Sequence, residues 1–188
     1  MTEETKSVGR RELHARHIEM IGYVRDDGLY EVEGRLLDRK TYTFQTDAPA
    51  SAVAPGEPIH HMWVKLVYDE DMRIHDVSAG TDSAPYADCF GAAQALSGLR
   101  GLVMSAGWSQ EIRARLGGAK GCTHMTQLLQ PMATTAFQTL SKVRLGRPTK
   151  RDADGRPEKI DSCWAYGSDR AVVAARWPEH ATGKTRPL

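Results

Sequence analysis

The residues best suited to chemistry in this sequence of 188 residues surround His60, which begins an alternating apolar segment. A predicted hairpin register places His60 opposite Gly80, so we expect a cavity of side-chain size beside the imidazole. Asp82 is expected to orient His60, as carboxylates do for catalytic histidines, with Thr81 and Tyr86 beside it. The equally weighted alternative is a structural histidine that hydrogen-bonds to the backbone.

A second constellation is the glycine-rich segment 116–124, which opens a long uncharged stretch. Free backbone N–H groups at the start of a helix could bind an anion such as a carboxylate beside Lys120. Cys122 would have a lowered pKa there, although a free cysteine is more often a small packed hydrophobe. The alternative is a purely structural connection with Thr123 as the N-cap. Neither GxxxxGK[ST] nor GxGxxG occurs, so these routes to nucleotide binding have no support.

A polar stripe that includes His124 and Gln127 follows on the same predicted helix. Buried polar groups need partners, so the stripe indicates either a pocket wall or a polar core network, and we favour the pocket. We therefore predict His60 and His124 as general acid and base, with Asp82 or Asp76 as the orienting carboxylate and Tyr86 as a hydrogen-bond donor. The candidate substrate-binding residues are Trp63, Thr81, Lys120, Cys122, Thr123 and Gln127.

No metal ligand is predicted, because HxH, HExxH and HxxxH spacings do not occur, and no cofactor is predicted, because the sequence has no cofactor motif. A metal site built from His60, His75, His124 and acids is the less favoured alternative. The three cysteines, Cys89, Cys122 and Cys163, form no CxxC pair and are expected to be free thiols.

The elements that must position these residues begin with two hairpins. Apolar residues alternate over 17–37, and Asp26-Asp27-Gly28 is expected to form the loop with Gly28 left-handed, so that Ile18 faces Leu36. Residues 60–68 alternate in the same way, with a turn at 69–71. Pairing positions that sum to 140 places Val64 opposite Asp76 and His60 opposite Gly80, with Asp76 on the inner face.

Helical spacing predicts short helices over 86–96 and 109–116 and a long helix, buried on most sides, over 121–141. Residues 160–166 and 171–177 are expected to form a last strand pair. The fold class is therefore α+β, with about six antiparallel strands in a curved sheet wrapped around the long helix. We expect a single domain over 1–188, with mobile tails at 1–11 and 178–188.

The charge balance excludes several partner classes. With 25 Lys and Arg against 24 Asp and Glu, the formal net charge of +1 offers no basic excess for nucleic acid. A mean hydropathy of −0.48 excludes an integral membrane protein. The first ten residues resemble neither a signal peptide nor a transit peptide, so we expect a cytoplasmic protein.

The segments Gly22–Leu36, Gly56–Trp63 and Gly121–Leu129 together resemble the bacterial domain-of-unknown-function family DUF2889, over about His17 to Trp177. The resemblance implies a shared pattern at eight positions, and departures at His61, where an acid is usual, and at Trp164, where a histidine commonly follows the cysteine. It also implies a loose association with bacterial aromatic catabolism. The matching positions are His60, Trp63, Asp76, Asp82, Tyr86, Cys122, Thr123 and His124.

These observations favour a cofactor-independent small-molecule enzyme of the lyase, isomerase or deformylase type, acting on an aromatic or carboxylate substrate. The alternative is a non-enzymatic protein that binds a small ligand in the same cavity, and a weaker alternative is a metal-dependent hydrolase. The expected partner is a small molecule, and outward Trp63 suggests a homodimer.

Overall fold

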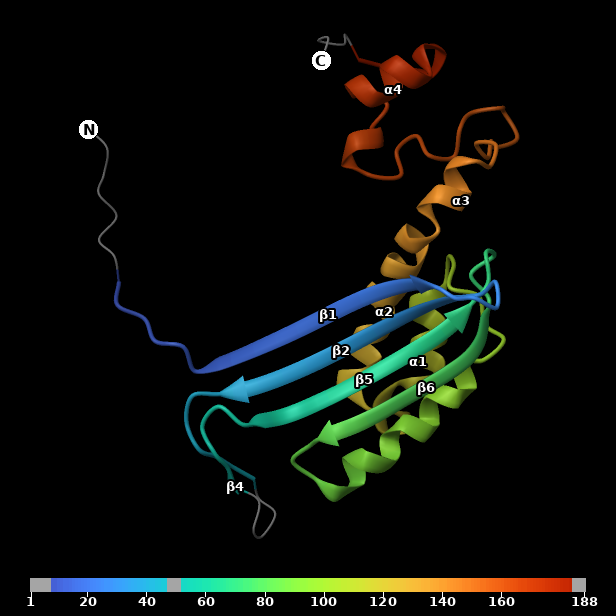
Figure 1. The fold of residues 1–188 in the computed structure, drawn as a ribbon. Helices are drawn as coiled ribbons and strands as arrows, with labels where there is room; N and C mark the ends of the chain where they lie inside the picture. Colours follow the sequence, from blue (N-terminus) through green and yellow to red (C-terminus); the bar gives the residue numbers. More distant parts are fainter. Residues whose placement is uncertain (1–7, 47–51, 184–188) are drawn as a thin grey trace, which may run out of the picture. The chain divides into compact units, whose positions relative to one another are not determined.

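A computed structural model describes residues 8–46 and 52–183 (Figure 1). The chain divides into two compact units, residues 1–141 and 142–188, which are described separately. The expectation of a single domain stays a prediction. The predicted mobile tails fall partly on residues 1–7 and 184–188, which lie outside the described residues.

The first unit is built on a four-stranded antiparallel sheet in the order β1-β2-β5-β6. These strands are β1 (His14–Val24), β2 (Tyr30–Lys40), β5 (Pro58–Tyr68) and β6 (Ile74–Ser83). The register predicted for the first hairpin is confirmed, because Ile18 lies opposite Leu36 and Val24 opposite Tyr30. Gly28 has a φ of 83°, the left-handed conformation that this loop requires.

Helices cover one face of the sheet, which makes the unit a mixed α+β structure (Figure 1). They are η1 (Ala87–Leu99), α1 (Trp108–Leu116), η2 (Gly118–Lys120) and α2 (Thr123–Thr139). Helix α2 packs on β1, β2 and β5, and at Gly34 an added Cβ would lie 2.9 Å from Met132 Sδ. The missing side chain of Gly34 therefore lets α2 approach the sheet closely. None of the helices in the described residues is long and apolar enough to cross a membrane.

The prediction that the long helix is buried on most sides is wrong. Met125, Leu128, Leu129 and Met132 are buried, whereas Phe137 on the opposite face is 42% exposed. A single apolar face on the sheet is what an amphipathic helix of a two-layer structure needs, and the polar stripe can then meet water instead of core partners.

The main sheet has four strands, whereas about six were predicted. Two further strands, β3 (Phe44–Gln45) and β4 (Ala52–Val53), form a separate two-residue pair. The register predicted for the second hairpin is also wrong, because Val64 lies opposite Ala79 and Trp63 opposite Gly80. A bulge between Val67 and Tyr68 adds a residue to β6, and one extra residue exchanges the two faces of a strand.

Two expectations fail with this register. Val77 takes the buried place that was expected for Asp76, which is exposed. Gly80 lies beside Trp63 instead of His60, and an added Cβ there would come within 2.7 Å of the indole ring. The space expected as a cavity is therefore occupied by Trp63.

We predict that Gly80→Ala displaces the Trp63 indole and lowers the free energy of unfolding by about 1–3 kcal/mol, as overpacking does. Urea unfolding and tryptophan fluorescence measure both effects. In a Trp63→Ala background the collision is removed, so the same substitution should cost much less. Gly91→Ala is the matched control, because an added Cβ at Gly91 has no atom within 4 Å.

The described residues of the second unit contain short helices and one isolated antiparallel bridge, between Arg151 and Pro157. The helices are the end of α3 (Ser141–Leu145), η3 (Trp164–Tyr166), α4 (Ala171–Arg176) and η4 (Pro178–His180). The strand pair predicted for 160–166 and 171–177 is therefore wrong, because short apolar runs do not distinguish a strand from a helix by period alone. Ile160, Val173 and Trp177 form a separate small core here.

Candidate functional site

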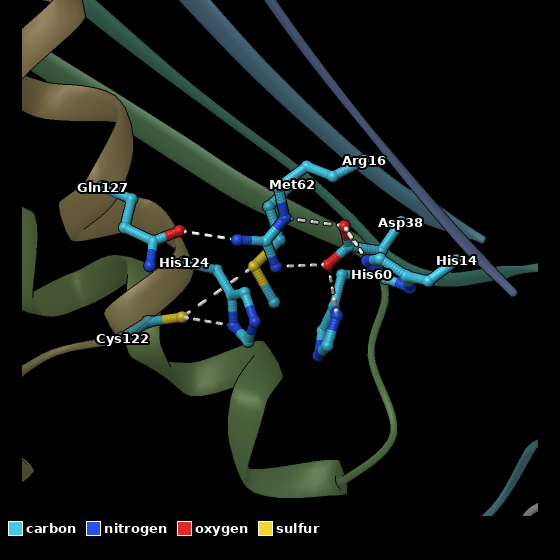
Figure 2. Close-up of polar contacts among 8 residues, drawn as sticks. All are labelled: His14, Arg16, Asp38, His60, Met62, Cys122, His124 and Gln127. Carbon is cyan, nitrogen blue, oxygen red and sulfur yellow. Dashed lines mark hydrogen bonds and ion pairs between the residues drawn. The ribbon is translucent and has the colours of Figure 1, made fainter. Parts of the chain in front are cut away.

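The site is organised around Asp38, a carboxylate with no exposed surface on the inner face of β2. Arg16 lies directly opposite Asp38 in the β1–β2 register. Its Nε and Nη2 atoms donate hydrogen bonds to the two carboxylate oxygens, both at 2.7 Å (Figure 2). This two-point contact fixes the plane of the carboxylate.

Two histidines complete the surroundings of this carboxylate. His60 of β5 lies opposite Asp38 on its other side, and its Nδ1 atom is 2.9 Å from Oδ2. The Nε2 atom of His14 is 3.3 Å from Oδ1. Burial alone would raise the pKa of Asp38, but the hydrogen bonds from Arg16 and His60 outweigh it, so the pKa is lowered. The carboxylate is therefore ionised at neutral pH.

An ionised carboxylate can only accept hydrogen bonds, so the Nδ1–H of His60 donates to Asp38. Whenever the ring is uncharged, its Nε2 atom carries the lone pair. The side chain of His60 is 15% exposed, which leaves an edge of the ring accessible to a small molecule. Asp38 thus fixes the tautomer of His60 in the way that the sequence led us to expect of Asp82.

The second imidazole comes from α2. The rings of His60 and His124 face each other with centroids 3.8 Å apart and an angle of 31° between their planes. Burial lowers the pKa of His124, the positive charge that His60 carries when it is protonated and the charge of Arg16 lower it further, and Asp38 partly opposes them. His124 is therefore neutral at neutral pH, with a ring nitrogen free to accept a proton.

The start of α2 brings His124 to the sheet. Gly117 and Gly121, both in extended conformations, flank η2, and the chain then enters α2 after Cys122, whose carbonyl accepts a hydrogen bond from the N–H of Thr126. The Nη1 atom of Arg16 donates a 2.8 Å hydrogen bond to Gln127 Oε1, which ties α2 to β1. Arg16 therefore contacts both Asp38 and the helix that carries His124.

Two sulfur atoms border the imidazole pair. Cys122 Sγ lies 4.0 Å from His124 Nδ1 and 3.8 Å from Met62 Sδ (Figure 2). Met62 lies on the same inner face of β5 as His60, two residues further along the strand. The site therefore combines two imidazoles and a carboxylate with polarisable sulfur on one side.

Among the residues predicted from the sequence, the structure brings together His60, His124, Cys122 and Gln127. It adds Asp38, Arg16 and His14, which sequence analysis missed. The signal was present in the confirmed first hairpin, because continuing its register pairs Arg16 with Asp38. An acid at an inward position opposite an arginine is a pattern that strand alternation can identify.

The predicted acids lie away from the imidazole pair. Asp82 is half exposed, with Oδ2 3.4 Å from His61 Nδ1 on the outer face of the sheet, so it does not orient His60. Asp76 accepts a hydrogen bond from Arg100 at the surface. Tyr86 precedes η1 and is 47% exposed.

The remaining predicted binding residues are dispersed as well. Trp63 packs over Gly80 on the outer face, and Thr81 donates a 3.4 Å hydrogen bond to the carbonyl of Cys89. Lys120 donates to the carbonyl of Ala114 at 3.1 Å, and Thr123 is exposed at the first position of α2. The predicted anion site beside Lys120 thus has its ammonium group engaged with a helix carbonyl.

Comparison with known proteins gives one finding. Residues 14–138 match the model of the family described as protein of unknown function (DUF2889). These residues make up most of the chain and contain every residue of the Asp38 site, so the chain belongs to this family. The match ends before Cys163 and Trp164. No curated protein and no solved structure matches.

Proposed function

We propose that this member of DUF2889 is a small-molecule enzyme that transfers protons through His60 and His124 and needs no organic cofactor. The observation that carries the proposal is the spatial arrangement of Asp38, His60 and His124. A buried carboxylate lies 2.9 Å from one imidazole, which faces a second imidazole at 3.8 Å. A carboxylate that orients a neutral histidine is the usual arrangement of a general base.

The roles follow from the contacts. His60 accepts a proton at Nε2, and Asp38 stabilises the imidazolium that results. His124 is the second proton-transfer group: its neutral ring can accept this proton from His60, and the same proton is then returned to another atom of the substrate. Arg16 and His14 hold Asp38 and are positioning residues, because each acts through the carboxylate. Asp38 takes the orienting role that sequence analysis gave to Asp82 or Asp76.

An isomerase step requires only such transfers, a lyase step also breaks one bond within the substrate and releases two products, and a deformylase step also consumes a water molecule and releases formate. One imidazole removes a proton from carbon or oxygen, and the imidazole pair then donates that same proton to the position where the electron pair arrives. The substrate we propose is an aromatic or carboxylate compound, with the exposed amide of Gln127 and the thiol of Cys122 nearest to the imidazole pair. A role in bacterial aromatic catabolism, a cytoplasmic location and a homodimer belong to the same proposal.

Hydrogen–deuterium exchange can test this function before the product is known. The protein is incubated in D2O with a panel of hydroxylated aromatic acids, keto acids and other carboxylates, and proton NMR follows the loss of C–H signals. We expect the wild-type protein to accelerate exchange at one C–H position of at least one compound. The panel is repeated after exhaustive chelation, because the proposed reaction needs no metal.

The second candidate is a binding protein without turnover. One observation favours it: no buried side-chain nitrogen or oxygen among the described residues lacks a hydrogen-bond partner, so the histidines could serve the network alone. Native mass spectrometry of freshly purified protein distinguishes the two. A retained, unchanged small molecule, together with no exchange across the panel, would favour binding over catalysis.

A further inference from the structure

We infer that Asp38, His60 and His124 form a binding site for a divalent transition metal ion. Each residue offers one ligand atom, and the three atoms lie within 4.8 Å of one another. The inference concerns binding and not turnover. It rests on the geometry of the site, and it stands or fails independently of the proposed reaction.

The distances suit a single ion. A metal–ligand bond to nitrogen or oxygen is about 2.0–2.2 Å, so the ligand atoms of a tetrahedral ion are about 3.4 Å apart. Ligand atoms within 4.8 Å of one another therefore need to approach by at most about 1.4 Å, and an ion bound by Nδ1 of His60 replaces the proton between this atom and Asp38. His124 can make this adjustment, because it lies in the first turn of α2 and is only half buried.

The three ligands come from three different elements, β2, β5 and α2. Sequence spacing could not show the site for this reason, since no two of the ligands are close in the chain. The carboxylate is already held by Arg16 and His14, which gives the site the outer contacts that metal-binding carboxylates need. Figure 2 shows the two imidazoles and the carboxylate converging from these elements.

The donor set indicates the class of metal. Two imidazoles with one carboxylate suit the Fe2+ to Zn2+ range, whereas Mg2+ and Ca2+ prefer oxygen ligands alone. The guanidinium of Arg16 compensates the charge of Asp38, which further disfavours hard cations bound by charge. The sulfur atoms of Cys122 and Met62 beside the imidazoles point to the same class.

The test uses Co2+, which has visible absorption bands when it is bound by protein ligands, on full-length protein first stripped with a chelator. We expect one Co2+ per chain, displaced by Zn2+. Replacing a ligand should weaken binding more than about 100-fold in both His60→Ala and His124→Ala, since loss of an outer-shell partner alone costs about 10–100-fold. His75→Ala is the matched control, because His75 pairs with Asp69 at the surface.

Cys122→Ser then shows whether the thiol of Cys122 also binds the ion. A near-ultraviolet thiolate band that disappears in this variant would add Cys122 to the ligand set, and its absence limits the set to the three residues. The inference is overturned if Co2+ binds with less than one equivalent per chain, or if His60→Ala and His124→Ala bind it as tightly as His75→Ala. Circular dichroism of each variant confirms that a loss of binding is not a loss of fold. The exchange assay, run without metal, is unaffected by either outcome.

Discussion

Asp38→Ala is expected to lower the free energy of unfolding by about 3 kcal/mol, because it removes one partner of a buried charge network and leaves the others unpaired. Arg16 would lose two hydrogen bonds, His60 would lose its acceptor, and His14 would lose the carboxylate that lies 3.3 Å from its Nε2 atom. Urea unfolding of the two proteins at neutral pH measures the difference. Asp76→Ala is the matched control, since Asp76 pairs with Arg100 at the surface, and it should cost about 0.5 kcal/mol or less.

The effect of Asp38→Ala also depends on pH in a defined direction. The pKa of Asp38 is lower in the folded protein than its ordinary value of 3.8, so its contribution to stability is present above that value. The contribution is lost as the pH falls through the folded-state pKa. The stability difference between wild type and variant should therefore shrink in acid. A difference that is constant from neutral pH to strong acid would contradict the ion-pair account.

His124→Ala is expected to slow the exchange reaction of an identified substrate by about 10²–10⁴-fold, the usual contribution of a general acid or base. The reason is the ring-to-ring contact with His60, which places both imidazoles at one reacting centre. If the two act as a unit, the double variant with His60→Ala should be hardly slower than either single variant. Rates of the three variants under saturating substrate give the comparison.

Additive losses would instead indicate two independent groups, and full activity in His124→Ala would remove it from the proposed mechanism. Gln130→Ala on the exposed side of the same helix is the control. Gln130 hydrogen-bonds to Ser109 and not to the imidazole pair, so its replacement should leave the rate unchanged.

Cofactor-free proton transfer and metal binding compete for the same lone pairs. Activity that survives chelation and falls when Zn2+ is added would make the metal an inhibitor of the proposed reaction. Activity that chelation abolishes would favour the metal-dependent hydrolysis considered from the sequence. Both results are compatible with a metal site. The first would make the bound ion an inhibitor, and the second would make it necessary for activity.

Sequence patterns predicted the first hairpin correctly because the position of its loop and the alternation of its apolar residues indicate the same register. Gly28 supplies the left-handed residue, and the continuous β1–β2 ladder keeps the apolar residues on one face. The second hairpin has a bulge after Val67, which alternation does not reveal, and the shift moved Gly80 from His60 to Trp63. The expected cavity beside His60 was lost with it.

The candidate site was predictable in part for related reasons. His60 and His124 were identified as inward residues because each lies in a periodic apolar segment. Asp38 was missed although it is as far from His60 in the chain as Asp82, because the pairing of β2 with β5, which places Asp38 opposite His60, was not predicted. Contacts between elements distant in sequence depend on the packing of α2 on the sheet, which a single sequence does not display.

The most direct test of the account compares His60→Ala with His61→Ala in the exchange assay. The two residues are neighbours on β5, but His60 faces Asp38 and His124, whereas His61 faces Asp82 on the other side of the sheet. We predict that His60→Ala loses about 10²-fold or more of the exchange rate while His61→Ala keeps the wild-type rate. Equal rates in the two variants would contradict the assignment of Asp38, His60 and His124 as the catalytic site.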